Sequence, residues 1–210
     1  MPLDSKAALL LIDVQQGFDD PRWGPRNNPD AERIIAQLLG HWRAACRPVF
    51  HVRHDSRTPG SSLHPDHRGN EFNPLVRPLD GEAVYPKAVN SAFIGTSLER
   101  DLREQGISTL AIVGLTTNHC VSTTARMAGN LGFETFVVSD ATATFDRIGL
   151  DGKVRAAAEV HASALSDLHE EFATVIDSGH LLAGFGASGR VLGESPASHE
   201  ITGTRLSGDI

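Results

Sequence analysis

Short apolar runs alternate with helical patterns along most of this chain, and this alternation constrains the fold more than any other feature. The first run, residues 7–12, is continuously apolar and ends at Asp13, as expected for a strand buried on both faces of a parallel sheet. Five further runs follow at residues 49–53, 82–85, 109–113, 134–139 and 174–177. The alternation predicts a Rossmann-like three-layer α/β/α fold with a six-stranded parallel sheet, in which the first and fourth strands are neighbours.

The segments between the runs carry helix signals. Asn28-Pro29-Asp30 and a capping box at 96–99 mark two helix starts, and a third helix is expected at about 120–130. Apolar residues also recur at helical spacing from Val154 to Leu168, which predicts a long helix. Residues 54–81 have no periodicity, as in a functional loop. We expect one domain over residues 1–177 and a Gly-rich tail over 178–210.

Composition narrows the class of partner. The formal net charge is −7, from 19 Lys+Arg and 26 Asp+Glu, so nucleic-acid binding is not expected. No apolar run approaches the ~20 residues of a membrane span, and residues 1–6 lack a signal pattern. With two cysteines there is no disulfide framework, and we expect a reduced, cytoplasmic setting. The Gly-rich tail has little apolar content for a core of its own, which favours a homo-oligomer.

Three reactive residue types fall at carboxyl ends of predicted strands. Asp13 follows the first strand, Lys87 follows the third, and Cys120 lies on the turn after the fourth. Ligands in such folds bind at this edge of the sheet, so a carboxylate, an ammonium and a thiol are expected in one pocket. We also expect the start of a helix at Cys120 to stabilise its thiolate. Separately, each of the three has an ordinary structural explanation; their shared placement favours function.

Three blocks of sequence resemble the isochorismatase-like cysteine hydrolases. They are Leu9-Leu10-Leu11-Ile12-Asp13-Val14-Gln15, Pro86-Lys87, and Val113-Gly114-Leu115-Thr116-Thr117-Asn118-His119-Cys120-Val121. The resemblance spans about residues 7–177 and implies a six-stranded parallel sheet, hydrolysis of amide-like C–N bonds, and a triad of Asp13, Lys87 and Cys120. It also implies a cis peptide at Leu115–Thr116. The backbone N–H groups of Thr116 and Cys120 would then form an oxyanion hole.

The remaining substrate-binding candidates surround this triad. We expect Phe18, Trp23 and Phe93 to supply apolar walls, and His54 to contact polar groups of the substrate. His119 is a rival base for the thiol, but we place it in the pocket wall because sequence neighbours at a helix start generally point apart. The set of substrate-binding candidates is Phe18, Trp23, His54, Phe93, Leu115, Thr117 and His119.

Two departures from the resemblance bear on chemistry. Nicotinamide-hydrolysing relatives carry a metal-binding Asp-x-His-Pro block after the second strand, whereas this chain has Arg53-His54-Asp55-Ser56-Arg57. His64, Asp66 and His67 offer ligand types nearby, but a loop of this composition is more often solvated, so we predict neither a metal nor another cofactor. True isochorismatases cleave a vinyl ether and lack the cysteine, so a cysteine at 120 favours amide chemistry. Residues 51–70 and 90–96 look most like the streptothricin hydrolase branch.

The sequence therefore predicts a cysteine hydrolase that cleaves an amide, lactam or carbamoyl bond of a small molecule through a thioester. Two other classes remain open. A thiol redox protein would use Cys120 as a peroxide-sensing residue, although Cys46 is on a remote helix and gives no nearby resolving thiol. A non-catalytic binding protein on the same scaffold would bind a ligand without turnover. Amide hydrolysis distinguishes the first reading from both alternatives.

Overall fold

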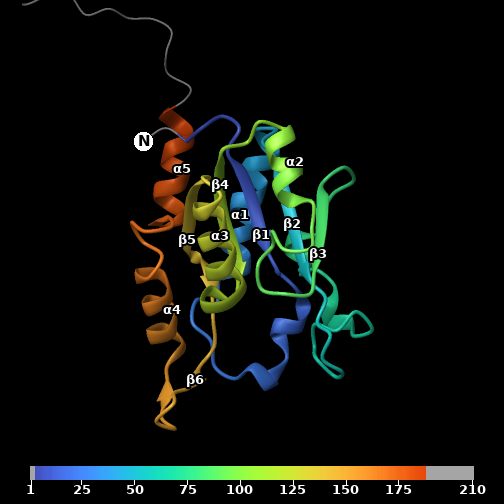
Figure 1. The fold of residues 1–210 in the computed structure, drawn as a ribbon, viewed down its shortest axis with the longest axis vertical. Helices are drawn as coiled ribbons and strands as arrows, with labels where there is room; N and C mark the ends of the chain where they lie inside the picture. Colours follow the sequence, from blue (N-terminus) through green and yellow to red (C-terminus); the bar gives the residue numbers. More distant parts are fainter. Residues whose placement is uncertain (1–2, 188–210) are drawn as a thin grey trace, which may run out of the picture.

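The computed structural model describes residues 3–187 (Figure 1). Its main sheet has six strands, all parallel to their neighbours, in the order β3-β2-β1-β4-β5-β8. The predicted fold class and the pairing of the first with the fourth strand are confirmed. The strands are β1 (Ala8–Ile12), β2 (Val49–His54), β3 (Ala83–Lys87), β4 (Thr109–Leu115), β5 (Glu134–Ala143) and β8 (Thr174–Ile176).

Helices cover both faces of the sheet and form the outer layers. The helices are α1 (Ala31–Ala44), α2 (Leu98–Glu104), α3 (Ser122–Asn130), α4 (Ala157–Ser166) and α5 (Ser178–Ala187). Alternate residues of β1 serve the two faces: Leu10 packs in a core with residues of α2, α3 and α4, and Leu9 packs with residues of α1 and α5. In Figure 1, α3 lies in front of the sheet and α1 behind it. Both faces of β1 are therefore buried, which explains its unbroken apolar sequence.

Short elements fill the connections. Four are 3-10 turns: η1 (Gln16–Asp19), η2 (Pro21–Trp23), η3 (Arg68–Asn70) and η4 (Pro74–Val76). The π-helical turn η5 (Thr117–Val121) leads from β4 into α3. A hairpin of β6 (Arg147–Ile148) and β7 (Val154–Arg155) projects at the bottom of Figure 1.

Two expectations about the C-terminal part are wrong. Val154 belongs to β7 instead of the following helix, because the Asp146 carboxylate accepts a hydrogen bond of 2.7 Å from the Ala157 N–H and so fixes the helix start there. Part of the predicted tail is helix α5. Its start is held by Asp140, which accepts hydrogen bonds from the Ser178 N–H and hydroxyl. Residues 188–210 lie outside the described part of the chain. Between residues 3 and 187, no helix has the length and apolarity needed to span a bilayer.

Candidate active site

Asp13 ends β1 in an unusual backbone conformation. Its φ is 51°, in the left-handed region that non-glycine residues adopt rarely and that often marks functional sites. The chain is held there by the Asp13 N–H, which donates to the Val52 carbonyl at 3.0 Å, and by the Gln15 N–H, which donates to the Asp13 carbonyl at 2.8 Å. The side chain of Asp13 is completely buried. The turn after β1 thus directs a carboxylate into the protein interior.

Lys87, the last residue of edge strand β3, pairs with this carboxylate. Its Nζ donates to Asp13 Oδ2 at 2.6 Å, and both side chains have no solvent exposure. The second oxygen, Asp13 Oδ1, has no hydrogen-bond partner among the described residues. Burial raises the pKa of Asp13, and this effect exceeds the opposing effect of Lys87. One carboxylate oxygen is therefore occupied by the ammonium and the other is free to accept a proton.

Cys120 lies within η5, near the Asp13 carboxylate. Its Sγ is within 4.8 Å of a carboxylate oxygen of Asp13 and of a ring nitrogen of His54, and it is 3.8 Å from Asn90 Oδ1. Burial and the Asp13 carboxylate raise the pKa of Cys120 to about 12, although Lys87 acts in the opposite direction. Burial thus opposes the thiolate that the sequence predicts at this helix start, because it disfavours the charged form of the group.

The turn that carries Cys120 begins with a cis peptide at Leu115–Thr116, which confirms that expectation. The Thr116 carbonyl accepts hydrogen bonds from the N–H groups of His119 at 3.1 Å and Val121 at 3.2 Å. Thr116 and Thr117 are both buried. The turn is therefore tightly held on both sides of the cysteine.

His54 joins the triad at the end of β2, directly opposite Lys87 in the ladder. Lys87 Nζ is 3.2 Å from His54 Nδ1. An ammonium only donates hydrogen bonds, so Nδ1 must be the acceptor and the ring proton sits on Nε2. Burial and Lys87 lower the pKa of His54, outweighing Asp13 and Asp55. His54 is therefore a neutral imidazole at neutral pH. His54 therefore contacts Lys87 directly, whereas the sequence predicted only a contact with polar groups of the substrate.

The expected aromatic residues fall into two groups. Phe18 and Trp23 pack with Phe145, with ring centroids 5.1 to 6.1 Å apart, in a cluster that includes Leu115. Phe93 packs in the same core cluster as Cys120. Phe18 and Trp23 thus share a cluster with Leu115, and Phe93 shares one with Cys120. Phe145 and Asn90 were not predicted; Phe145 lies two residues beyond β5, and Asn90 three residues after Lys87.

Thr117 and His119 point to partners outside the triad. Thr117 Oγ1 is 2.9 Å from His161 Nδ1 of α4. His119 is half-buried, with Nδ1 3.3 Å from Thr116 Oγ1 and Nε2 3.3 Å from Asn118 Nδ2. Burial and Arg147 lower the pKa of His119. These contacts give Thr117 and His119 roles in holding the turn.

One cluster of metal-ligand types occurs between residues 3 and 187. It consists of Asp13, His54 and Cys120, whose carboxylate, imidazole and thiol are donors that zinc accepts. However, Lys87 Nζ already contacts Asp13 Oδ2 and His54 Nδ1, so a cation occupies the place between two of the three donors. The residues therefore fit an ammonium better than a metal ion.

Two histidines of the 54–81 loop, His64 and His67, accept hydrogen bonds within turns of that loop. His64 Nδ1 accepts a hydrogen bond from the Asp66 N–H at 3.2 Å, and His67 Nδ1 accepts one from the Gly69 N–H at 2.9 Å. Neither residue belongs to the cluster of metal-ligand types. The donor types noted in the sequence are thus used in local loop structure.

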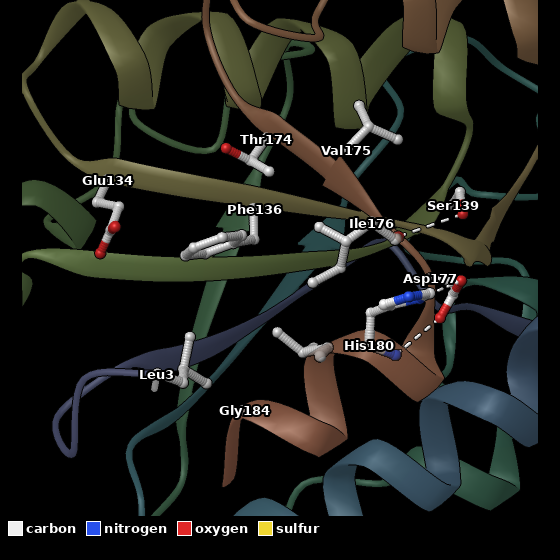
Figure 2. Close-up of a pocket in the computed structure, with 11 residues that line it drawn as sticks. Leu3, Glu134, Phe136, Ser139, Thr174, Val175, Ile176, Asp177, His180 and Gly184 are labelled. Atoms are coloured by element: carbon white, nitrogen blue, oxygen red, sulfur yellow. Dashed lines mark hydrogen bonds and ion pairs between the residues drawn. The ribbon is translucent and has the colours of Figure 1, made fainter. Parts of the chain in front are cut away.

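Two cavities differ in their relation to the triad. One of about 320 Å³ is lined by Lys87, Asp55, Arg57 and neighbouring residues of the loop after β3. A larger one of about 600 Å³ lies between β5, β8 and α5 (Figure 2). In that pocket the carboxylate of Asp177 is paired with His180 at 2.7 Å, and none of the triad residues lines it. Of the triad residues, only Lys87 lines the smaller cavity.

Comparison with known proteins identifies relatives over nearly the whole described chain. The model of the isochorismatase domain matches residues 7–179. The isochorismatase family protein YrdC of Bacillus subtilis is 45% identical over 183 residues, covering 87% of this chain and 98% of YrdC. A crystal structure of an isochorismatase-family protein from Chromobacterium violaceum superposes with a TM-score of 0.86 at 46% identity, covering 89% of this chain and 97% of that one.

Two relatives have names that state an activity. Nicotinamidase 3 of Arabidopsis thaliana is 30% identical, covering 84% of this chain and 87% of its own length. Streptothricin hydrolase of Streptomyces noursei is 35% identical over 142 residues, covering 66% of this chain and 55% of its own length.

Proposed function

Because the chain belongs to the isochorismatase family, a family of hydrolases, we propose that it cleaves a C–N bond of a small amide, lactam or carbamoyl compound through Asp13, Lys87 and Cys120. The observation that carries the proposal is the buried Asp13 carboxylate, which has one unpartnered oxygen and lies within 4.8 Å of the Cys120 sulfur. Nucleophile, base and orienting group are the three parts that covalent catalysis requires.

The residues divide the chemistry among them. Asp13 takes the proton of the Cys120 thiol as the sulfur attacks the carbonyl carbon of the substrate, and Lys87 offsets the negative charge. The backbone N–H groups of Thr116 and Cys120 stabilise the tetrahedral oxyanion. Asp13 then gives its proton to the leaving nitrogen, and the C–N bond breaks to leave a thioester on Cys120. Water, deprotonated by Asp13, attacks the thioester and releases the acid and the thiol.

The raised pKa values of Cys120 and Asp13 suit this series of reaction steps. A thiol whose pKa is about 12 keeps its proton until a substrate is in place, and a buried carboxylate with a raised pKa is a better base than an exposed one. Substrate binding, which removes remaining water, is then the event that starts the attack.

The names of two relatives support the choice of bond. Nicotinamidase 3 and streptothricin hydrolase are both named for hydrolysis, and the first name specifies an amide.

A substrate panel tests the proposal. Primary amides, lactams, ureides and carbamoyl amino acids are incubated with the protein and with Cys120→Ala, and released ammonia and ring-opened products are measured. We expect turnover of at least one class by the wild type and none by the variant. Peroxide consumption with a thiol reductant and no amide turnover would instead favour the redox reading.

A further inference from the structure

We propose that His54 is a positioning residue for Lys87: its neutral imidazole accepts a hydrogen bond from the ammonium and so keeps Asp13 Oδ1 free for the proton of Cys120. This inference rests on the proposed function, and it adds a fourth residue to the triad. His54 acts through Lys87 and Asp13, because its Nδ1 is occupied by Lys87 Nζ at 3.2 Å.

The geometry of the ammonium carries the argument. Lys87 Nζ has three protons, and it contacts one oxygen of Asp13 at 2.6 Å and Nδ1 of His54 at 3.2 Å. A buried ammonium without a second acceptor would move toward the remaining oxygen of the same carboxylate, since unpaired donors are costly in the interior. With His54 present, Asp13 Oδ1 stays unpartnered among the described residues. The histidine thus decides which carboxylate oxygen the ammonium uses.

The backbone of His54 is fixed from two directions. The Gln15 side chain accepts a hydrogen bond from the His54 N–H at 2.9 Å and donates one to its carbonyl at 3.1 Å. The Asn70 side chain donates to the same carbonyl at 3.1 Å, and Gln15 also donates to the Asn70 carbonyl at 2.9 Å. Gln15 and Asn70 are both buried. The 54–81 loop is therefore tied to the end of β1 through the residue that contacts Lys87.

The charge state of His54 agrees with an acceptor role. The groups that face His54 are Lys87 of β3, Asp13 after β1, its chain neighbour Asp55 and the Cys120 thiol. Burial and Lys87 lower the pKa of His54 despite the two carboxylates. A protonated ring would instead direct an N–H toward the ammonium and break the contact. The arrangement therefore requires a neutral His54.

The test compares His54→Leu, which removes the acceptor, with His54→Asn, whose side-chain oxygen can take nearly the position of Nδ1. Cys46, an exposed free cysteine, is changed to serine in every protein so that only Cys120 reacts. The exposed His41 of α1 supplies the matched control, His41→Leu. The rate of Cys120 alkylation by iodoacetamide is measured without substrate at pH 7.5, followed by kcat and KM on whichever amide the panel identifies. Urea unfolding verifies that each variant is folded.

We expect His54→Leu to lower the alkylation rate and kcat by at least about tenfold, as for a weakened general base, with KM little changed. His54→Asn should retain most of the alkylation rate and most of kcat, and His41→Leu should match the parent in both. Alkylation at the parental rate in folded His54→Leu would overturn the proposal, as would a His54→Asn variant that is as impaired as His54→Leu. If no amide is hydrolysed by the parent, the proposed function fails, but the alkylation comparison still decides the role of His54.

Discussion

Asp13 and Lys87, 74 positions apart in the sequence, form an ion pair whose side chains are both fully shielded from solvent. Taking two charges out of water is costly, and such a pair is maintained only with close geometry and further hydrogen bonds. Here the ammonium has a second acceptor in His54. The pair is therefore a feature with a stability cost, of the kind expected at a catalytic site.

Replacing one member of this pair should destabilise the protein strongly. In Lys87→Met the Asp13 carboxylate is left buried without its cation, and we expect a loss of about 3–5 kcal/mol in the free energy of unfolding. Guanidinium titration measures it, with the exposed Lys153 as the control position in Lys153→Met. A loss no larger than that of the control would show that the pair is not buried as described.

The thiol of Cys120 should titrate far above neutral pH. With a pKa of about 12, its thiolate fraction rises about tenfold per pH unit up to that value, so alkylation in the Cys46→Ser background should accelerate through pH 10 without levelling off. The pH dependence of iodoacetamide labelling, read by intact mass, is the measurement. A plateau beginning near pH 7 would mean a preformed thiolate.

Glu82 should make stability depend on pH in the acid range. Burial raises its pKa, but hydrogen bonds from Arg43, the Leu79 N–H and His51 prevail and lower it to about 2, from an ordinary value of 4.5. A depressed carboxyl pKa stabilises the fold above 4.5, and this stabilisation is lost as the pH falls from 4.5 toward about 2.

We therefore expect Glu82→Gln to lower the free energy of unfolding by about 1–2 kcal/mol at pH 7, a figure reduced because the group is partly exposed. Below pH 4.5 the loss should become progressively smaller. Urea unfolding between pH 3 and 7 follows the difference. Glu104→Gln, at an exposed position of α2, serves as the control. A pH-independent difference would count against the network.

Activity should not require a metal ion. In the cluster of Asp13, His54 and Cys120, the Lys87 ammonium already contacts one atom of Asp13 and one of His54. The loop histidines His64 and His67 accept hydrogen bonds within turns. Dialysis against a chelator should leave turnover unchanged. Loss of turnover that zinc restores would reverse this conclusion.

Much of the site follows from the sequence because topology places it. In a parallel sheet the carboxyl ends of strands meet at one edge. Asp13, Lys87 and Cys120 lie at or just after the ends of β1, β3 and β4, which fall within four consecutive strands of the sheet, so the strand order brings them to the same edge. The strand order follows from the alternation of elements, whereas the cis peptide is implied by the resemblance of residues 113–121 to the isochorismatase-like cysteine hydrolases.

What the sequence could not give depends on contacts between distant segments. Asp146 fixes the start of α4 and Asp140 that of α5, and neither pairing has a local signature. Val154 fits the helical spacing, yet it is paired with Ile148 in the hairpin. The contact of His54 with Lys87 depends on an ammonium from another strand, and the high pKa of Cys120 depends on burial and on the Asp13 carboxylate. Residue spacing reveals neither.

Direct detection of the acyl-enzyme tests whether Cys120 forms a thioester with the substrate. Once a substrate amide is known, the protein is mixed with it, quenched in acid within milliseconds to seconds, and analysed by intact mass and peptide mapping. We predict an adduct with the mass of the acyl group on Cys120. The adduct should be absent from Cys120→Ala, which should bind substrate without turnover. Near-normal amide turnover by Cys120→Ala would contradict it.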